Sequence, residues 1–470
     1  MITCCCTIIR FKHYKEKQLG PQAHRKQRNT KDRGYSRDRP IPDIEAVKTP
    51  AEHQTLHQPE TGCHGFILSS SLIGVPGHVC QIKSRNPHIQ NDLYLRRMLK
   101  VGILGGGQLG RMLLQAAANY DVETHVLESE TDCPAAHLCR HFTQGDIRDF
   151  DTVYTFGKLL DAITIEIENV NVAALEKLEA EGVKVYPKPS VLRMIKNKIL
   201  QKEYYKSQSL PTAQYIITQN LTDLKAAQHF LPAVHKIAEG GYDGRGVQLI
   251  KNTADVDKGF DAPAILEKQV FIKKEIAVLV AVDQQGKVAL YPPVEMMFNK
   301  ALNLLDYQLC PAAISEKVLW KVEAIAMTLV RNLNSPGLFA VELFVDENDD
   351  VLVNETAPRV HNSGHHTIEA HFSSQFDMLW RIILGHPLGN TKAILSSIMV
   401  NVIGSEGHTG PAKYEGLNDV LQIDNAFLHI YGKKETKPGR KMGHVTILSN
   451  EKQDLIHKAN KVKGALTVVA

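Results

Sequence analysis

The stretch VNETAPRVHNSGHH, residues 353–366, gathers chemically active side chains directly after an apolar, strand-like run. Glu355 ends that run, and four polar side chains follow within eight positions: Arg359, His361, Asn362 and Ser363. Arginine, asparagine and serine side chains bind anions, and histidine carries a proton near neutral pH. A solvated loop needs no such combination, so we predict that this segment meets an acidic small molecule beside a metal ion.

A second carboxylate lies opposite Glu355 if the segment FAVELFVDENDDVLVNET folds as a hairpin. With a turn at Glu347–Asp350, Asp346 faces Val351 and Glu342 faces Glu355. Directly opposed side chains have Cβ atoms roughly 4.5–5.5 Å apart, where like charges repel. A divalent cation removes the repulsion, and oxygen ligands with a phosphate partner suit Mg²⁺, with Mn²⁺ as a substitute. We therefore predict a metal site at this pair; the alternative is two solvated edge carboxylates.

The segment KIAEGGYDGRGV predicts a phosphate-binding loop. A strand ending in Lys236 leads into four glycines, whose backbone N–H groups can donate to a polyphosphate while the lysine supplies positive charge. A mobile hairpin tip is the alternative. Tyr242, Asp243 and Arg245 stand between the glycines and argue against it, because a simple tip does not need these groups.

The segment GILGGGQLGRM has the spacing G-x-G-x-x-G between a strand and a helix, which suits an anion at the helix N-terminus. Glu128, at the end of the next strand, could bind a ribose, so an NAD-dependent oxidoreductase is one hypothesis. The same turn serves other α/β folds, and nothing downstream resembles hydride-transfer chemistry. Near the C-terminus, KKETKPGRK is either a solvated basic face or a site for a second phosphate.

The elements that must position these residues are of two kinds. From Leu99 to about 200, strands alternate with amphipathic helices, which predicts a parallel sheet covered on both faces. After Pro211, short strands separated by Gly and Asp turns predict an α+β region with antiparallel sheet. We expect an α/β domain at 98–200, an α+β domain at 201–395 and a small β-rich domain at 396–470.

Residues 1–97 differ from the rest of the chain. They carry a net charge of +8 against +4 for the whole chain, so residues 98–470 carry −4. They show no strand or helix period, and we expect a basic, disordered and dispensable leader, with Met98 as the possible true start. A nucleic-acid arm and a targeting segment are alternatives. No apolar run is long enough for a membrane span. Only three cysteines lie after residue 97, which is typical of a reduced cytoplasmic protein.

Together the motifs GGGQLGRM, EIENV, LPTAQY, GGYDGRG, NETAPRVHNSGHH and KPGRKMGH resemble the N5-carboxyaminoimidazole ribonucleotide synthetases, the PurK-type family of the ATP-grasp superfamily. The resemblance covers residues 98–470 and implies an ATP-grasp fold between a Rossmann-like pre-ATP-grasp domain and a small C-terminal domain. It also implies ATP contacts at Lys198, Lys236, Gly241, Tyr242, Asp243, Gly244, Arg245, Gly246, Val247, Glu267, Lys268, Gln269, Val270, Glu275, Asn354 and Glu355. Within this set, Glu267–Val270 would hold adenine through backbone and Glu275 the ribose hydroxyls.

The resemblance further implies that Mg²⁺ is held by Glu342 and Glu355. It places the reaction at Tyr242, Asp243, Arg245, Arg359 and His361. The implied substrate contacts are Gln108, Glu166 or Glu168, Asn362, Ser363, Lys434 and Arg440.

The implied reaction is the ATP- and bicarbonate-dependent carboxylation of 5-aminoimidazole ribonucleotide through carboxyphosphate, with ADP and phosphate released. The implied partners are these small molecules and a second copy of the chain, with neither nucleic acid nor membrane. Another ATP-grasp carboxylate–amine ligase and, from a different class, the NAD oxidoreductase are the alternatives.

Overall fold

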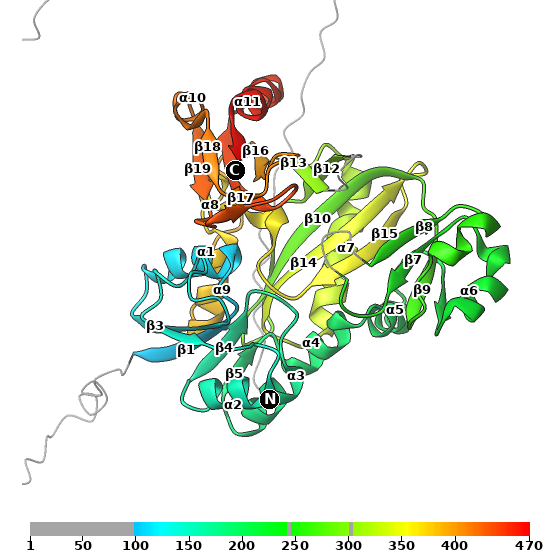
Figure 1. The fold of residues 1–470 in the computed structure, drawn as a ribbon, viewed down its shortest axis with the longest axis horizontal. Coiled ribbons are helices and arrows are strands. Elements are labelled where there is room, and N and C mark those ends of the chain that lie inside the picture. Colours follow the sequence, from blue (N-terminus) through cyan, green and yellow to red (C-terminus); the bar gives the residue numbers. More distant parts are fainter. Residues whose placement is uncertain (1–97, 242–245, 300–303) are drawn as a thin grey trace, which may run out of the picture. The chain divides into compact units, whose positions relative to one another are not determined.

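The computed structural model of the chain describes residues 98–241, 246–299 and 304–470 (Figure 1). These residues form sheets of two kinds, parallel near residue 98 and antiparallel further along. The combination of α/β and α+β regions that the sequence predicts is confirmed.

Strands and helices alternate in the first part of the described chain. All strand pairs there are parallel, in the order β3-β2-β1-β4-β5. Val101 and Ile103 lie in one hydrophobic cluster and Leu104 in another, so the sheet is buried on both faces. The elements are β1 (Leu99–Leu104), α1 (Gln108–Ala117), β2 (Val122–Glu128), β3 (His141–Gln144), α2 (Phe150–Gly157), β4 (Ala162–Ile165), α3 (Val172–Ala180), β5 (Lys184–Tyr186) and α4 (Pro189–Lys196).

A four-stranded antiparallel sheet follows, in the order β6-β9-β7-β8. Its helix α5 begins after Asn197, whose side chain accepts hydrogen bonds from the N–H groups of Ile199 and Leu200 and so caps the helix. The elements are α5 (Lys198–Ser207), β6 (Tyr215–Thr218), α6 (Leu221–Ala226), η1 (Gln228–Phe230), β7 (Ala233–Ile237), β8 (Val247–Ile250), η2 (Thr253–Lys258) and β9 (Ala264–Lys268).

A nine-stranded antiparallel sheet forms the largest layer, in the order β15-β14-β10-β12-β13-β16-β21-β19, with β11 beside β10. The strands are β10 (Ile272–Val282), β11 (Val288–Leu290), β12 (Val294–Asn299), β13 (Leu304–Cys310), β14 (Gly337–Asp346), β15 (Val351–Ala357), β16 (Ser397–Ile403), β19 (Ala426–Ile430) and β21 (Lys441–Leu448). Because β16 pairs with β13, one sheet continues across residue 395, where the sequence predicts a domain boundary.

Shorter elements accompany this sheet. Between β13 and β16 lie α7 (Glu316–Asn332), η3 (Asn362–Gly364), α8 (Thr367–Ala370) and α9 (Gln375–Leu384). Two small two-stranded sheets and two helices belong to the C-terminal part: β17 (Gly410–Pro411) with β20 (Glu435–Thr436), β18 (Lys413–Glu415) with β22 (Thr467–Val469), α10 (Leu417–Leu421) and α11 (Lys452–Ala465). Within the described residues, no helix is both long and apolar enough to cross a membrane.

The two faces of β10 are covered by different helices. Val278 and Val280 share a hydrophobic cluster with residues of α7, whereas Leu279 and Ala281 share one with residues of α9 and α1. Alternate residues of a strand point to opposite faces, so α7 and α9 lie on opposite sides of the sheet.

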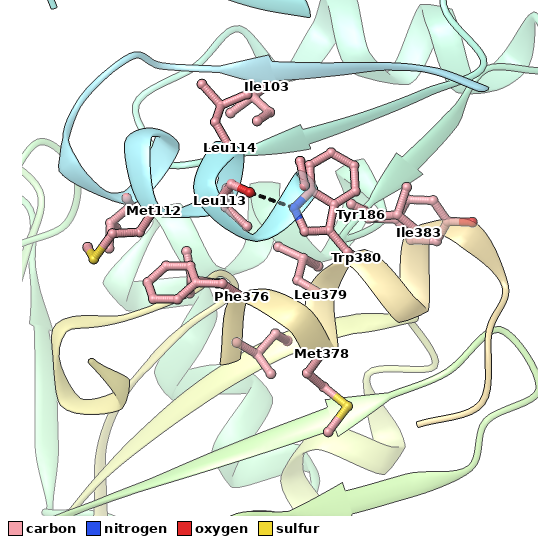
Figure 2. Close-up of a cluster of buried hydrophobic side chains, with 14 of the residues drawn as sticks. Ile103, Met112, Leu113, Leu114, Tyr186, Phe376, Met378, Leu379, Trp380 and Ile383 are labelled. Carbon is pink, nitrogen blue, oxygen red and sulfur yellow. Dashed lines mark hydrogen bonds between the residues drawn. The ribbon is translucent and has the colours of Figure 1, made fainter. Parts of the chain in front are cut away.

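Helix α9 joins the large sheet to the parallel domain (Figure 2). Its side chains pack against Met112, Leu113 and Leu114 of α1. At the centre, the indole Nε1 of Trp380 donates a hydrogen bond of 2.7 Å to the backbone oxygen of Leu113. This contact fixes the parallel domain beside the large sheet, and the functional side chains described below come from both.

We predict that Trp380→Phe destabilises the protein by about 2 kcal/mol, because it removes this hydrogen bond and part of a fully buried ring. Chemical denaturation measures the loss. The matched control is Trp320→Phe on α7, where the side chain is 72% exposed and the change should stay within about 0.5 kcal/mol. Equal losses in the two variants would contradict the role of this contact.

Candidate active site

The sheet face that packs against α9 changes from apolar to acidic along β10 and β14. Leu279 pairs with Ala340, and two residues further along Ala277 pairs with Glu342. Glu275 follows two residues beyond Ala277 and therefore lies on the same face. Two carboxylates thus continue a surface that is otherwise hydrophobic core.

The predicted pairing of Glu342 with Glu355 is confirmed. The predicted pairing of Asp346 with Val351 is wrong, because Val351 pairs with Val345. Asp346 instead closes the turn: its N–H donates to the Asp350 backbone oxygen, and its carboxylate accepts from the Asp350 N–H. The register is therefore shifted by one residue near the turn, and it is restored at the glutamates by a β-bulge in β15.

This bulge decides where Asn354 and Glu355 point. Neighbouring residues of a regular strand point to opposite faces, whereas a bulge adds an unpaired residue and redirects its side chain. Both residues line the same small cavity. The Nζ atom of Lys236 donates to Asn354 Oδ1 at 2.9 Å, and the Nζ atom of Lys198 donates to Glu355 Oε2 at 2.8 Å.

Three lysines meet carboxylates in this cavity. The carboxylate of Glu267, only 4% exposed, lies 2.5 Å from the Nζ atoms of both Lys202 and Lys236. Burial raises the pKa of Glu267, but the two lysines outweigh it and the net pKa is lowered. Sequence reasoning missed Lys202. The sequence feature that could have indicated Lys202 is its i,i+4 spacing from Lys198, which places both side chains on one face of α5.

The carboxylates suit a divalent cation. Burial, and then the charges of Glu355 and Glu275, raise the pKa of Glu342. The neighbouring Lys198 holds the pKa of Glu355 below its usual range. Oxygen ligands that repel each other in a half-buried position are stabilised by a hard cation such as Mg²⁺. The residues present therefore fit a divalent cation.

The cavity between the lysines and carboxylates measures about 10 Å³, so a phosphate can enter only if the lysines turn away from the carboxylates. A larger hollow of about 700 Å³ is lined by residues of the 203–217 segment. None of the predicted site residues lines that hollow.

The glycine-rich segment follows β7, whose Lys236 lines this cavity, and precedes β8. Gly246 has a φ of +77°, which favours glycine, and Val247 begins β8 opposite Lys236. Gly241 is also described. The predicted Tyr242, Asp243, Gly244 and Arg245 lie outside the described residues.

The segment predicted to hold adenine, Glu267–Val270, links β9 to the large sheet. The N–H groups of Lys268 and Gln269 donate to the backbone oxygens of Gln214 and Pro232. These two N–H groups are therefore not left for adenine under this hypothesis. Burial raises the pKa of Glu275, the predicted ribose ligand, to about 7.

The loop after β15 brings the predicted substrate residues to the same carboxylates. The Nε2 atom of His361 lies 3.7 Å from Glu342 Oε1, and Arg359 forms an ion pair of 2.8 Å with Glu168. The buried side chain of Gln375 holds the loop by accepting from the His361 N–H and donating to its carbonyl oxygen. Glu168 follows β4 of the parallel domain, so its ion pair with Arg359 links that domain to the loop after β15.

Asn362 and Ser363 lie at the start of the single turn η3. The Ser363 hydroxyl contacts His361 Nδ1 at 3.0 Å. Asn362 is 9% exposed, and both its amide nitrogen and its amide oxygen are without a hydrogen-bond partner. An unsatisfied buried amide is costly, so Asn362 is poised to bind a polar ligand.

The glycine turn before α1 binds a carboxylate of the chain itself. Glu166 accepts hydrogen bonds of 2.6 Å from the N–H groups of Gly107 and Gly110. A Cβ atom on Gly107 would lie 2.5 Å from Glu166 Oε1, so this approach requires glycine. Burial raises the pKa of Glu166, partly offset by these hydrogen bonds. Gln108 begins α1 directly beside this contact.

Glu128, the ribose acceptor of the NAD hypothesis, accepts from the Gly106 N–H at 3.0 Å. It is thus engaged with the glycine turn. At the other end of the chain, Lys434 forms an exposed ion pair of 2.7 Å with Asp132, and the Arg440 side chain donates to the Glu435 backbone oxygen. A phosphate site at these two residues stays a prediction.

We predict that Glu342→Gln raises the melting temperature of the ligand-free protein at pH 8, by about 1–2 °C, because it removes repulsion from Glu355. The pKa of Glu342 is raised in the folded state. The contribution of this one carboxyl group to the stability of the wild type therefore falls as the pH rises above its ordinary pKa of 4.5. The gain should therefore vanish below that pH. Thermal melts across pH measure it, with Glu347→Gln in the exposed turn as control. A gain independent of pH would contradict the prediction.

Comparison with known protein families gives three matches along the chain. Residues 98–196 match the ribonucleotide synthetase preATP-grasp domain, residues 203–376 the ATP-grasp domain, and residues 397–458 the phosphoribosylaminoimidazole carboxylase C-terminal domain.

Relatives of known name agree. The N5-carboxyaminoimidazole ribonucleotide synthase of Brucella melitensis is 37% identical over 357 residues, which cover 74% of this chain and 95% of the relative. The chloroplastic phosphoribosylaminoimidazole carboxylase of Vigna aconitifolia is 35% identical over 365 residues, and the chain spans 64% of its length.

Solved structures show the same relationship. The N5-carboxyaminoimidazole ribonucleotide synthetase of Thermotoga maritima superposes with a TM-score of 0.74 at 37% identity, covering 79% of this chain and 100% of that one. The Aspergillus clavatus enzyme in complex with ADP and 5-aminoimidazole ribonucleotide gives 0.72 at 31%, covering 78% and 98%. The predicted ATP-grasp fold, with its preATP-grasp and C-terminal domains, is confirmed, and this chain belongs to the N5-carboxyaminoimidazole ribonucleotide synthase family of the ATP-grasp superfamily.

Proposed function

We propose that this chain is an ATP-dependent ligase of purine biosynthesis. In the proposed reaction, bicarbonate carboxylates 5-aminoimidazole ribonucleotide at its amine and yields N5-carboxyaminoimidazole ribonucleotide, ADP and phosphate. The family assignment leaves the NAD oxidoreductase hypothesis without support.

The observation that carries the proposal is the pairing of Glu342 with Glu355 beside Lys198 and Lys236. Two opposed carboxylates with two lysines can bind a metal–triphosphate complex, because each charge of the ligand meets its opposite. His361 lies close to Glu342, so the loop after β15, residues 358–366, which we call the substrate loop, reaches the same carboxylates. Phosphoryl transfer needs such positioning and charge neutralisation more than covalent chemistry.

On the ATP side, Lys198 and Lys236 exchange their carboxylate partners for phosphate oxygens, and Glu342 and Glu355 hold Mg²⁺. The ion, when bound, neutralises charge on the transferring phosphoryl group. Bicarbonate oxygen attacks the γ-phosphorus, ADP leaves, and carboxyphosphate results. The proposed role of the glycine-rich segment from Gly241 to Val247 is to shield this intermediate from water.

On the substrate side, Arg359 and the amide of Asn362 bind the anionic intermediate or the ribonucleotide. The amine nitrogen forms a bond to the carboxyl carbon, phosphate leaves, and one proton is lost from the nitrogen. The candidates for accepting that proton are Asp243 and His361. Gln108, Glu166, Glu168, Ser363, Lys434 and Arg440 complete the proposed substrate contacts.

We further propose Mg²⁺ as the metal with Mn²⁺ as its substitute, a cytoplasmic location, and a homodimer with neither nucleic acid nor membrane as a partner. The three cysteines of the described residues are free, as expected of a reducing compartment.

Phosphate release from Mg·ATP tests the function directly. Release should require 5-aminoimidazole ribonucleotide and bicarbonate together, and each omission should reduce it to background. Release with formate in place of bicarbonate would favour another ATP-grasp ligase. A nicotinamide absorbance change without phosphate release would revive the oxidoreductase hypothesis.

We predict that Asp243→Asn lowers kcat at least tenfold while leaving the KM for ATP nearly unchanged. The reason is that its proposed role, proton transfer or closure over bound substrate, follows ATP binding. Steady-state kinetics measure both constants, with the exposed Asp257→Asn as control. Equal losses in kcat and in ATP affinity would make Asp243 a nucleotide contact instead.

A further inference from the structure

A second cluster of potential metal ligands lies buried beneath the substrate loop. Cys310 is the last residue of β13, while His366 and His371 flank the short helix α8. One ligand atom from each residue can be chosen so that all three lie within 4.8 Å of one another. None of the three side chains is more than 3% exposed. No role in the reaction proposed above uses these residues.

Three of the four ring nitrogens of these histidines lack a hydrogen-bond partner. Both ring nitrogens of His371 and the Nε2 atom of His366 are buried without one. Buried polar atoms are nearly always hydrogen-bonded, because leaving one unpaired costs free energy. Three unpaired nitrogens beside a thiol therefore need an explanation, and a bound cation would accept the lone pairs of two of them, one from each ring.

Ordinary ring packing explains only part of the arrangement. His371 lies edge-on to His366 at 5.0 Å and tilted to Tyr291 at 5.6 Å. These contacts use the rings but satisfy none of the three nitrogens. Met296 and Met399 pack with Cys310 in an apolar cluster, which keeps water away from the thiol.

The protonation of the histidines suits metal binding. Burial lowers the pKa of His371 to about 4 and holds the pKa of His366 well below its usual range, so both rings are neutral at pH 7. A neutral imidazole offers the lone pair that a metal needs. The side-chain nitrogen of Gln308 lies 2.9 Å from His366 Nδ1 and donates to the Ser363 backbone oxygen. Metal binding through Nε2 needs the ring proton on Nδ1, so on binding the Gln308 amide turns its oxygen, which has no hydrogen-bond partner here, toward that nitrogen.

One thiolate and two imidazoles are ligands for a borderline or soft transition-metal ion rather than for Mg²⁺. Zn–S and Zn–N bonds of about 2.3 and 2.0 Å put tetrahedral ligand atoms roughly 3.3–3.6 Å apart, so the ligand atoms need to approach one another by at most about 1.5 Å. We propose that Cys310, His366 and His371 bind one Zn²⁺ ion, in a site separate from that of Mg·ATP.

Such an ion would fix the substrate loop. His366 lies two residues after Gly364, at the end of the segment that carries Arg359 and His361, and β13 is part of the large sheet. The site therefore ties the loop and the residue after α8 to the sheet. Burial raises the pKa of the Cys310 thiol to about 12, so the ion must displace the thiol proton to solvent as it binds. A water molecule that enters with the ion can take the fourth position.

The described residues contain a second group of potential metal ligands, which offers a comparison. It consists of Glu123, His125 and His141. It lies on β2 and β3, where His141 is half exposed, and Glu123 already contacts both histidines at 3.0 and 3.3 Å. It carries no unpaired buried nitrogen, and it serves as a control.

Zinc binding by the full-length chain tests the proposal. After removal of metal with a chelator, Zn²⁺ is titrated in competition with a chromogenic chelator. The wild type should bind one equivalent, with micromolar or tighter affinity, that is lost in both Cys310→Ser and His371→Leu. The matched controls Cys139→Ser and His141→Gln should keep it. Zn²⁺ bound elsewhere, for example by Cys4–Cys6, is common to all five proteins and cancels in the difference.

Co²⁺ supplies a spectroscopic signature. The wild type should show a thiolate-to-cobalt band in the near ultraviolet that Cys310→Ser lacks and Cys139→Ser retains. A hundredfold excess of Zn²⁺ over Kd should also raise the wild-type melting temperature by about 2 °C or more, but not that of His371→Leu. Equal Zn²⁺ uptake by wild type and both site variants would overturn the proposal, as would no uptake by the wild type. If Cys310→Ser fails to fold, His371→Leu decides, because leucine fills the same buried position without a ligand.

Discussion

The charge balance around Glu342 and Glu355 is the constraint on which the rest of the site depends. Two carboxylates face each other on a sheet surface that is otherwise hydrophobic, and like charges in that position repel. Lys198 relieves the repulsion at Glu355, while Lys202 and Lys236 share the buried carboxylate of Glu267. Each lysine that leaves a carboxylate for a phosphate leaves negative charge behind, and a divalent cation compensates for it. Nucleotide and metal binding are therefore coupled by electrostatics.

The large sheet places these charges, and a single bulge sets their direction. Without the extra residue in β15, Glu355 would not face Glu342, and Asn354 would not join Glu355 at the lysines. The parallel domain adds Glu168 to the same loop, and the packing of Trp380 against Leu113 fixes that domain beside the sheet. Substrate contacts from two domains thus depend on one helix interface.

Much of the fold could be predicted because its signals are local. The alternation after Leu99 gave the parallel sheet, and the hairpin containing Glu342 and Glu355 followed from strand pattern and turn residues. The register near the turn was wrong because the Asp346 side chain accepts backbone hydrogen bonds from within the turn, which strand pattern does not reveal. The predicted pairing of Glu342 with Glu355 is nevertheless correct, because the β-bulge shifts the register back by one residue.

Other features depend on contacts between distant residues. The sequence of a glycine turn of the phosphate-binding type does not reveal that a carboxylate of the chain occupies it. Here that carboxylate is Glu166, 59 residues after Gly107. Cys310 and His371 lie far apart in sequence and meet only in the folded sheet. The sheet that continues from β13 to β16 likewise joins segments that composition separates. Sequence therefore identified residue types well and their partners less well.

The central claim is that Glu342 and Glu355 hold the metal of a metal–nucleotide complex. The most direct measurement is the affinity for Mn²⁺ with a non-hydrolysable ATP analogue, followed by the electron paramagnetic resonance of Mn²⁺, in wild type and in Glu355→Gln. The account predicts that affinity for the Mn·nucleotide complex falls at least tenfold in Glu355→Gln and is unchanged in the turn variant Glu347→Gln. Wild-type affinity in Glu355→Gln would contradict the account.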